Sequence, residues 1–116
     1  MHYLLDTHTL IWLLENNPQL SNRAQSIIAN EGNELFVSIA SIWEMTIKSS
    51  LGKLNLGIPL SDLIAQKLIP SDIQLLPIQL AHLAVLQTLP LYHRDPFDRI
   101  LIAQAITDQL TSYNKA

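Results

Sequence analysis

The feature that most constrains the fold is the alternation of short apolar segments with longer segments of helical period along the 116 residues. Segments 3–5 and 35–37 have strand length and no polar alternation, which is typical of strands covered on both faces. Between such segments, apolar residues recur at helical spacing, and no repeat or linker interrupts them. The alternation predicts an α/β fold, with a mostly parallel sheet and crossover helices.

Turn and capping residues give approximate bounds for these elements. Ser21 and Pro59 stand where helices are expected to begin, and Pro77 suggests that its strand lies at an edge or ends there. Asp95 followed by Pro96 marks the start of the last helix. We expect strands at 3–5, 35–37 and 75–78, and helices at about 9–16, after Ser21, toward Ser50, at about 59–69, at 81–89 and from Pro96.

Composition limits the kind of protein this chain can be. Its length allows one core, and the absence of cysteine excludes disulfides and thiolate metal sites. The start of the chain lacks the character of a signal peptide, and no apolar run is long enough to span a membrane, so we expect a cytoplasmic protein. With net charge −3 and only seven Lys and Arg, no broad basic face for nucleic acid is expected. Any RNA would be attracted by metal ions and a few local cations.

Four acidic residues carry the chemical hypothesis: Asp6, Glu44, Asp95 and Asp98. Each is expected just after a strand or in the opening turns of a helix, and in a parallel sheet such positions converge at the carboxyl edge. Carboxylates gathered there repel one another unless they are protonated or bound to metal. Oxygen ligands suit Mg²⁺ or Mn²⁺, and such an ion can assist phosphodiester hydrolysis.

Each acid also has a purely structural interpretation. Asp95 can cap the last helix, and Asp98 can interact favourably with the dipole of its first turn. Ser41 and Glu44 have the spacing of a capping box. Asp6 can cap the first helix. Taken singly, Asp95, Asp98 and Glu44 are better explained by these structural roles than by metal binding. For Asp6 the two interpretations are equally good.

Taken together, three motifs in order resemble the PIN domain, and more narrowly the VapC-type toxins of bacterial toxin–antitoxin pairs. The resemblance extends from Met1 to about Leu110. The residues that carry it are Leu4-Leu5-Asp6-Thr7-His8; Ser38-Ile39-Ala40-Ser41-Ile42-Trp43-Glu44 with Lys48 and Leu51-Gly52-Lys53-Leu54; and His93-Arg94-Asp95-Pro96-Phe97-Asp98-Arg99 leading into Ile102-Ala103-Gln104-Ala105.

The resemblance implies an α/β/α sandwich that acts as an RNA-cleaving toxin with Mg²⁺ or Mn²⁺. It makes Asp6, Glu44 and Asp98 the core metal-binding acids, with Asp95 beside them, and it implies a cognate antitoxin and a homodimer. The chain departs from the family pattern at its end, where a further acid is usual in the last strand and Asn114 stands near that place. We therefore expect residues 1–116 to form a single PIN-like domain with a shortened C-terminal strand.

Four cations flank the motifs and are candidates for contacts with RNA phosphates: Lys48, Lys53, Arg94 and Arg99. The alternative for Lys48 is a weak helical ion pair with Glu44, four residues earlier. Trp43 can stack on an unpaired base, but we expect it to be packed beneath Glu44.

Two other functions compete with that of a nuclease. A catalytically weak or inactive PIN-like protein would bind an antitoxin or RNA without turnover, as the missing C-terminal acid suggests. A phosphate-accepting signalling domain would need paired acids after the first strand and a late lysine following a strand. Neither feature occurs in this sequence.

Overall fold

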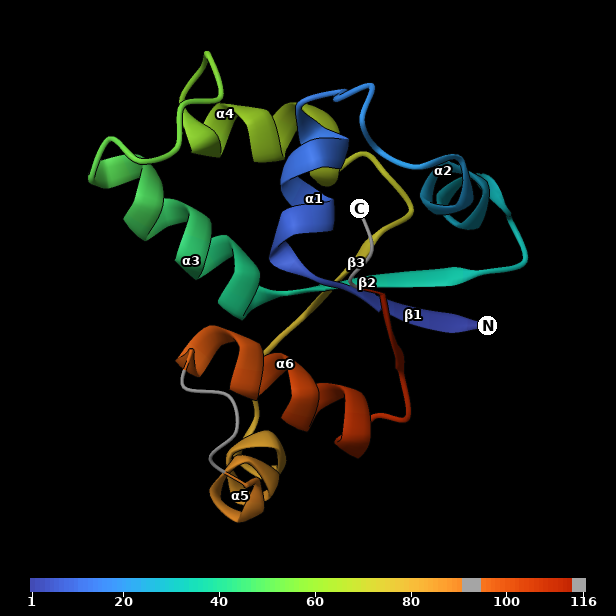
Figure 1. Cartoon of the computed structure of the whole chain (residues 1–116), viewed down its shortest axis with the longest axis vertical. Helices are drawn as coiled ribbons and strands as arrows, with labels where there is room; N and C mark the ends of the chain where they lie inside the picture. Colours follow the sequence, from blue (N-terminus) through green and yellow to red (C-terminus); the bar gives the residue numbers. More distant parts are fainter. Residues whose placement is uncertain (91–94, 114–116) are drawn as a thin grey trace.

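The computed structural model describes residues 1–90 and 95–113 of the chain. Its centre is a four-stranded sheet in the order β3-β2-β1-β4, with every pair of neighbours parallel. The strands are β1 (His2–Leu5), β2 (Glu34–Ser38), β3 (Gln74–Leu76) and β4 (Thr111–Tyr113). The α/β fold with a parallel sheet is thus confirmed, and Pro77 directly follows the edge strand β3 (Figure 1).

The helices fall close to their expected positions. They are α1 (Thr7–Leu14), α2 (Asn22–Ala29), α3 (Ile39–Ser50), α4 (Leu60–Leu63), the π-helical segment η1 (Ile64–Leu68), α5 (Leu80–Thr88) and α6 (Pro96–Thr107). Within the described residues, no helix is long and apolar enough to cross a membrane.

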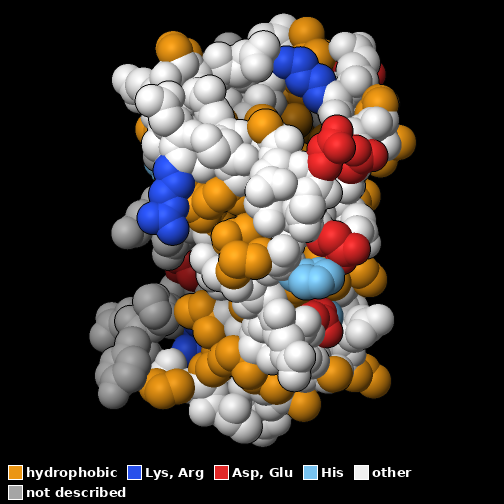
Figure 2. All heavy atoms as spheres, turned by 90° about the vertical axis from the view of Figure 1, so that its right-hand side faces the viewer, with side chains coloured by type: hydrophobic (Ala, Val, Ile, Leu, Met, Phe, Trp, Pro, Cys, Tyr) orange, Lys and Arg blue, Asp and Glu red, His pale blue; other side chains and the backbone are white. Residues whose placement is uncertain are grey.

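The surface carries charges of both signs. Figure 2 shows the side of the molecule on which the N-terminus lies in Figure 1. Lys and Arg side chains lie apart from one another there, with hydrophobic and uncharged side chains between them, and the described residues form no continuous basic patch on this face. This agrees with the small number of cations in the sequence.

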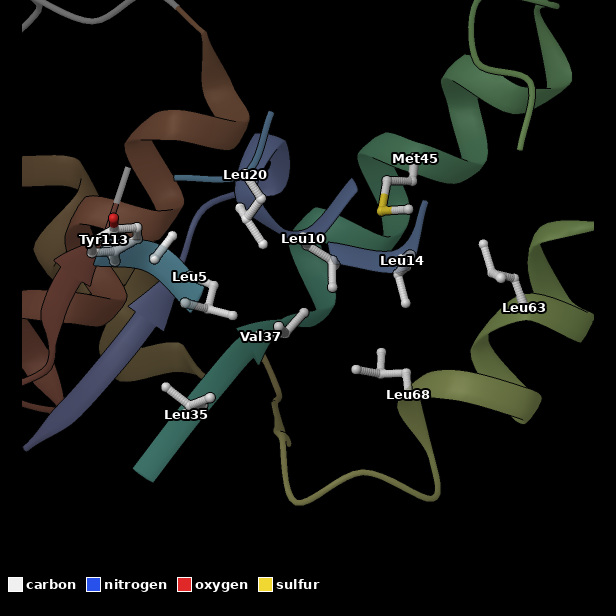
Figure 3. Packing of buried hydrophobic residues seen from close by; sticks show 11 residues of the cluster. Leu5, Leu10, Leu14, Leu20, Leu35, Val37, Met45, Leu63, Leu68 and Tyr113 are labelled. Atoms are coloured by element: carbon white, nitrogen blue, oxygen red, sulfur yellow. The ribbon is translucent and has the colours of Figure 1, made fainter. Parts of the chain in front are cut away.

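Helices cover both faces of the sheet because its strands are apolar on both sides. On one face, Leu5 and Val37 pack with residues of α1, α2, α3 and α4 such as Leu10 and Met45 (Figure 3). On the other face, Leu4 packs with Leu101 and Ala105 of α6, and α5 packs in turn on α6. The architecture is therefore the expected α/β/α sandwich.

Side-chain caps set the starts of two helices. Helix α1 begins at Thr7, two residues before the expected start, because Asp6 caps it: its Oδ1 accepts a hydrogen bond from the Thr9 amide at 2.8 Å. Helix α3 is capped by Ser38, whose Oγ accepts from the Ala40 amide at 3.0 Å. The capping box considered as the structural alternative for Glu44 is therefore wrong, because the helix has already begun before Ser41.

Candidate active site

A cleft of about 360 Å³ brings together three of the four predicted acids, Asp6, Glu44 and Asp98. They come from the end of β1, from α3 and from α6. The sequence separations between them are large, so the parallel sheet and its crossovers create the cleft. Its remaining lining residues are Thr7, His8, Ile11, Trp12, Lys48, Lys53 and Leu54.

The position of Asp6 is fixed from both sides by the backbone. Its amide donates a hydrogen bond to the carbonyl of Tyr113 in β4 at 3.0 Å, which extends the pairing of β1 with β4. Its side chain caps α1 through the Thr9 amide. One carboxylate oxygen is thus used for the cap, and the residue as a whole stays partly exposed beside the cleft.

A buried hydrogen bond joins the two helices that carry Asp6 and Glu44. The hydroxyl of Thr7 donates to Oγ of Ser41 at 2.9 Å, which links the first turn of α1 to the first turn of α3. Glu44 lies one turn further along α3 and is 8% exposed. This hydrogen bond fixes the spacing of the two helix starts and therefore of the two carboxylates.

The charge of Glu44 is balanced by Lys48 on the next turn of α3. Lys48 Nζ lies 2.9 Å from Glu44 Oε2, so the weak helical ion pair considered for this spacing is confirmed. The hydrogen bond with Glu44 raises the pKa of Lys48. The charges of Glu44, Asp95 and Asp98 raise this pKa further, and burial opposes them. The Lys48 ammonium is therefore part of the acidic cluster.

The two aspartates of α6 occupy different places. Asp98 is in the first turn of α6 and lines the cleft. Asp95 does not line it; its Oδ1 caps α6 by accepting from the Phe97 amide at 2.9 Å. Asp95 acts on the cluster through its charge, since it contributes to the raised pKa of Lys48.

The donors of the cleft suit a hydrated divalent ion. Carboxylate oxygens are the ligands that Mg²⁺ and Mn²⁺ prefer. Among the described residues, no three acidic or histidine side chains are close enough to form a group that could hold a metal ion. Mg²⁺, however, keeps several waters and is commonly bound through one or two carboxylates plus substrate phosphates. The residues present therefore fit such an ion without forming a closed cage.

The four predicted phosphate contacts are distributed unequally. Lys48 and Lys53 line the cleft. Arg99 donates hydrogen bonds to carbonyls at the end of α5 and just beyond it, including that of Leu86 at 3.2 Å and that of Pro90 at 2.8 Å. Arg94 lies outside the described residues. Two cations are thus placed beside the acids, and a third caps a helix.

Aromatic residues near the acids were less well predicted. Trp43 is 57% exposed and packs edge-to-face on Phe97 of α6, so the expectation that it is packed beneath Glu44 is wrong. His8 and Trp12 line the cleft and stack edge-to-face with ring centroids 4.6 Å apart. The hydrogen bond between Thr7 and Ser41, which joins the two helix starts, was not predicted from the sequence. The sequence signal was weak, because two hydroxyl residues near helix starts are ordinary capping residues.

A larger hollow, of about 750 Å³, lies elsewhere, at the amino ends of β2 and β3. Its lining includes apolar residues such as Leu35 and Ile73, with Glu31 and Asp72 among its acids. None of the four predicted acids lines it. The smaller cleft is the better candidate for chemistry, because convergent acids from separate elements line it.

Fold and cleft together define an α/β protein whose polar site lies at the carboxyl edge of a parallel sheet, where ligands bind in such folds. The family model of the PIN domain matches residues 3–112, and the chain belongs to this family. No curated protein matches the sequence.

Solved structures share the fold. One is the crystal structure of VapBC2 from Rickettsia felis bound to a DNA fragment from their promoter, with a TM-score of 0.67 and 13% identity over 100% of this chain and 89% of that one. Another is a toxin–antitoxin complex from Klebsiella pneumoniae, with a TM-score of 0.63 and 16% identity over 98% of this chain and 86% of that one. At these identities the likeness concerns the fold.

Proposed function

We propose that this protein is a metal-dependent endoribonuclease that hydrolyses RNA phosphodiester bonds as the toxin of a toxin–antitoxin pair. The observation that carries the proposal is the convergence of Asp6, Glu44 and Asp98 on one cleft. Membership of the PIN domain family supports a nuclease. The two similar structures, both of toxin–antitoxin systems, support the cellular role and an antitoxin partner.

In this proposal the carboxylates of Asp6, Glu44 and Asp98 hold Mg²⁺ or Mn²⁺, one or two of them directly and the rest through the waters that such an ion keeps, and Asp95 adds negative charge beside them. When bound, such an ion polarises a phosphoryl oxygen and lowers the pKa of a bound water. Lys48 and Lys53 would contact phosphates of the RNA, and their position in the lining of the cleft supports this. Arg94 and Arg99 are proposed as further contacts on the flank of the same motif. A toxin acting on cellular RNA works in the cytoplasm, which is the compartment we propose.

We further propose a homodimer, because large hydrophobic side chains are exposed on neighbouring helices. Leu80 and Leu83 on α5 are 84% and 45% exposed, and Ile106 on α6 is 55% exposed. The two helices pack on each other. Light scattering at micromolar concentration tests this, and a monomer would contradict the dimer.

The test of catalysis is cleavage of labelled single-stranded and structured RNA with Mg²⁺ or Mn²⁺. We expect cleavage that a chelator stops and that Asp6→Asn reduces by about 100-fold or more. Asparagine caps helices as well as aspartate does, so this change removes charge while preserving the α1 cap. The matched control is Asp62→Asn. Asp62 lies on α4 and does not line the cleft, so this substitution should leave the rate of RNA cleavage unchanged.

A catalytically silent binder is the second candidate. The lack, in the described part of the chain, of a three-donor group that could hold a metal favours it. It predicts tight antitoxin binding without metal-dependent turnover. Cleavage that is unaffected by chelator and by Asp6→Asn would contradict the proposed mechanism.

A further inference from the structure

The acidic cleft contains a cation that belongs to the chain itself. Lys48 Nζ is 2.9 Å from Glu44 Oε2, and the Lys48 side chain lines the same cleft as Asp6 and Asp98. Glu44 is the most buried of these acids, at 8% exposed, so its carboxylate is the one that most needs a partner. The Lys48 side chain is 46% exposed and leads to solvent.

A divalent ion bound by these acids would compete with that ammonium for the carboxylate of Glu44. Carboxylates that share a cleft repel one another unless a cation compensates them. Lys48 supplies this compensation through direct contact with Glu44 and through the attraction of Asp95 and Asp98. An ammonium and a divalent ion repel each other strongly at close range, so both cannot bind the same Glu44 oxygen.

We propose that Lys48 is the internal counter-ion of the acidic cleft, and that a divalent metal ion displaces its ammonium from Glu44 on binding. This inference rests on the proposed function, since it concerns the metal site of the nuclease. The lysine stem is flexible and half-exposed, so the ammonium can leave Glu44 and remain at the rim of the cleft. Metal affinity is therefore set partly by the strength of the ion pair that must be broken.

The matched residue for a test is Lys53. It lines the same cleft and carries the same charge, but among the described residues it forms no ion pair with an acid. Replacing either lysine by methionine keeps most of the apolar stem and removes one positive charge. Removing a positive charge from the cleft should strengthen metal binding to a similar extent in both variants. Only Lys48→Met also removes the ion pair with Glu44, so only this variant should show the additional gain in affinity.

The first experiment is calorimetric titration of the full chain with Mn²⁺ near neutral pH. We expect Lys48→Met to lower the Kd by about tenfold, and Lys53→Met to lower it by less than about threefold. Equal shifts in the two variants, or weaker binding by Lys48→Met, would overturn the proposal.

The second experiment needs no substitution and keeps the proposal testable if Lys48→Met does not fold. Lysine acetylation is followed by mass spectrometry in the natural chain with and without Mg²⁺. We expect the labelling rate of Lys48 to rise at least about threefold with metal, because its ammonium loses the Glu44 contact. Lys53 serves as the internal reference. A rate for Lys48 that changes no more than that of Lys53 would overturn the proposal.

The two proposals fail in different ways. Metal binding and RNA cleavage with unchanged affinity in Lys48→Met would overturn the competition and leave the nuclease standing. No heat and no change in labelling at millimolar Mn²⁺ would overturn both the competition and the metal dependence of the proposed function.

Discussion

Removing the hydrogen bond from Thr7 to Ser41 tests how strongly the two helix starts beside the cleft are held together. It is buried, with Ser41 at 0% and Thr7 at 8% exposed, and it joins the starts of α1 and α3. Thr7→Val keeps the shape of the side chain and removes the donor. The Ser41 hydroxyl is then left in the interior without the partner it has now.

The expected cost follows from this geometry. A buried polar group left without its partner costs about 1–3 kcal/mol, so we expect Thr7→Val to lower the free energy of unfolding by about 2 kcal/mol. Ser41→Ala should cost a similar amount. When both are changed no polar group is stranded, so the double variant should lose about 1 kcal/mol less than the sum of the two single variants.

The assay is urea denaturation of the two single variants, the double variant and the natural protein. Thr46→Val is the control, because its hydroxyl is exposed and bonds the carbonyl of Ile42 on the same helix at 2.7 Å. It should change stability by no more than about 0.5 kcal/mol. Additive losses within about 0.3 kcal/mol, or a loss in Thr7→Val no larger than in Thr46→Val, would refute the reasoning.

Two further predictions concern His82 and Lys48. His82 is 0% exposed, its Nε2 lies 2.8 Å from Asp108 Oδ2, and its Nδ1 accepts from the Gln79 amide at 3.0 Å. His82→Ala should therefore cost about 3 kcal/mol in urea denaturation, and a loss below about 1 kcal/mol would contradict this role. The pKa of Lys48 is raised above its ordinary value of 10.5, mainly by the hydrogen bond with Glu44. The ion pair of Lys48 with Glu44 should therefore stabilise the fold fully below pH 10.5, and this stabilisation should be lost as the pH rises through the higher pKa of the folded state. The difference in melting temperature between the natural protein and Lys48→Met should shrink as the pH rises through this range. A difference that grows there would contradict the prediction.

The sequence predicts well those features that follow from strand burial. An apolar run without alternation at 3–5 indicates a strand covered on both faces, and Leu4 and Leu5 indeed pack on opposite faces of the sheet. Once that strand is parallel to its neighbours, the residue that follows it must lie at the carboxyl edge. Asp6 could therefore be placed near other acids without any knowledge of their distances.

The sequence predicts poorly those features that depend on where a helix begins. The motif Ser41-x-x-Glu44 has the spacing of a capping box, but Ser38 at the end of β2 caps α3 first. With the start set three residues earlier, Ser41 bonds Thr7 instead. The same register turns Met45 inward and Trp43 outward. The capping box and the orientation of Trp43 were wrongly predicted for the same reason. The spacing of residues along the chain does not show where the helix begins, because a tertiary contact determines its first residue.

The placement of the cations bears on the proposed action of a chain of net charge −3 on RNA. Lys67 donates to the Leu14 carbonyl at the end of α1 at 2.9 Å, and Arg99 does the same for α5, so these charges stabilise helix ends. Among the described residues, Lys48 and Lys53 are the cations that line the cleft. Because salt screens exposed charges beyond about 10 Å, those two act most directly on a phosphate bound there. If metal binding displaces Lys48 from Glu44, the binding of the metal ion also makes the Lys48 ammonium available to contact an RNA phosphate. Metal and RNA binding should then reinforce each other in a chain that has only seven Lys and Arg with which to attract nucleic acid.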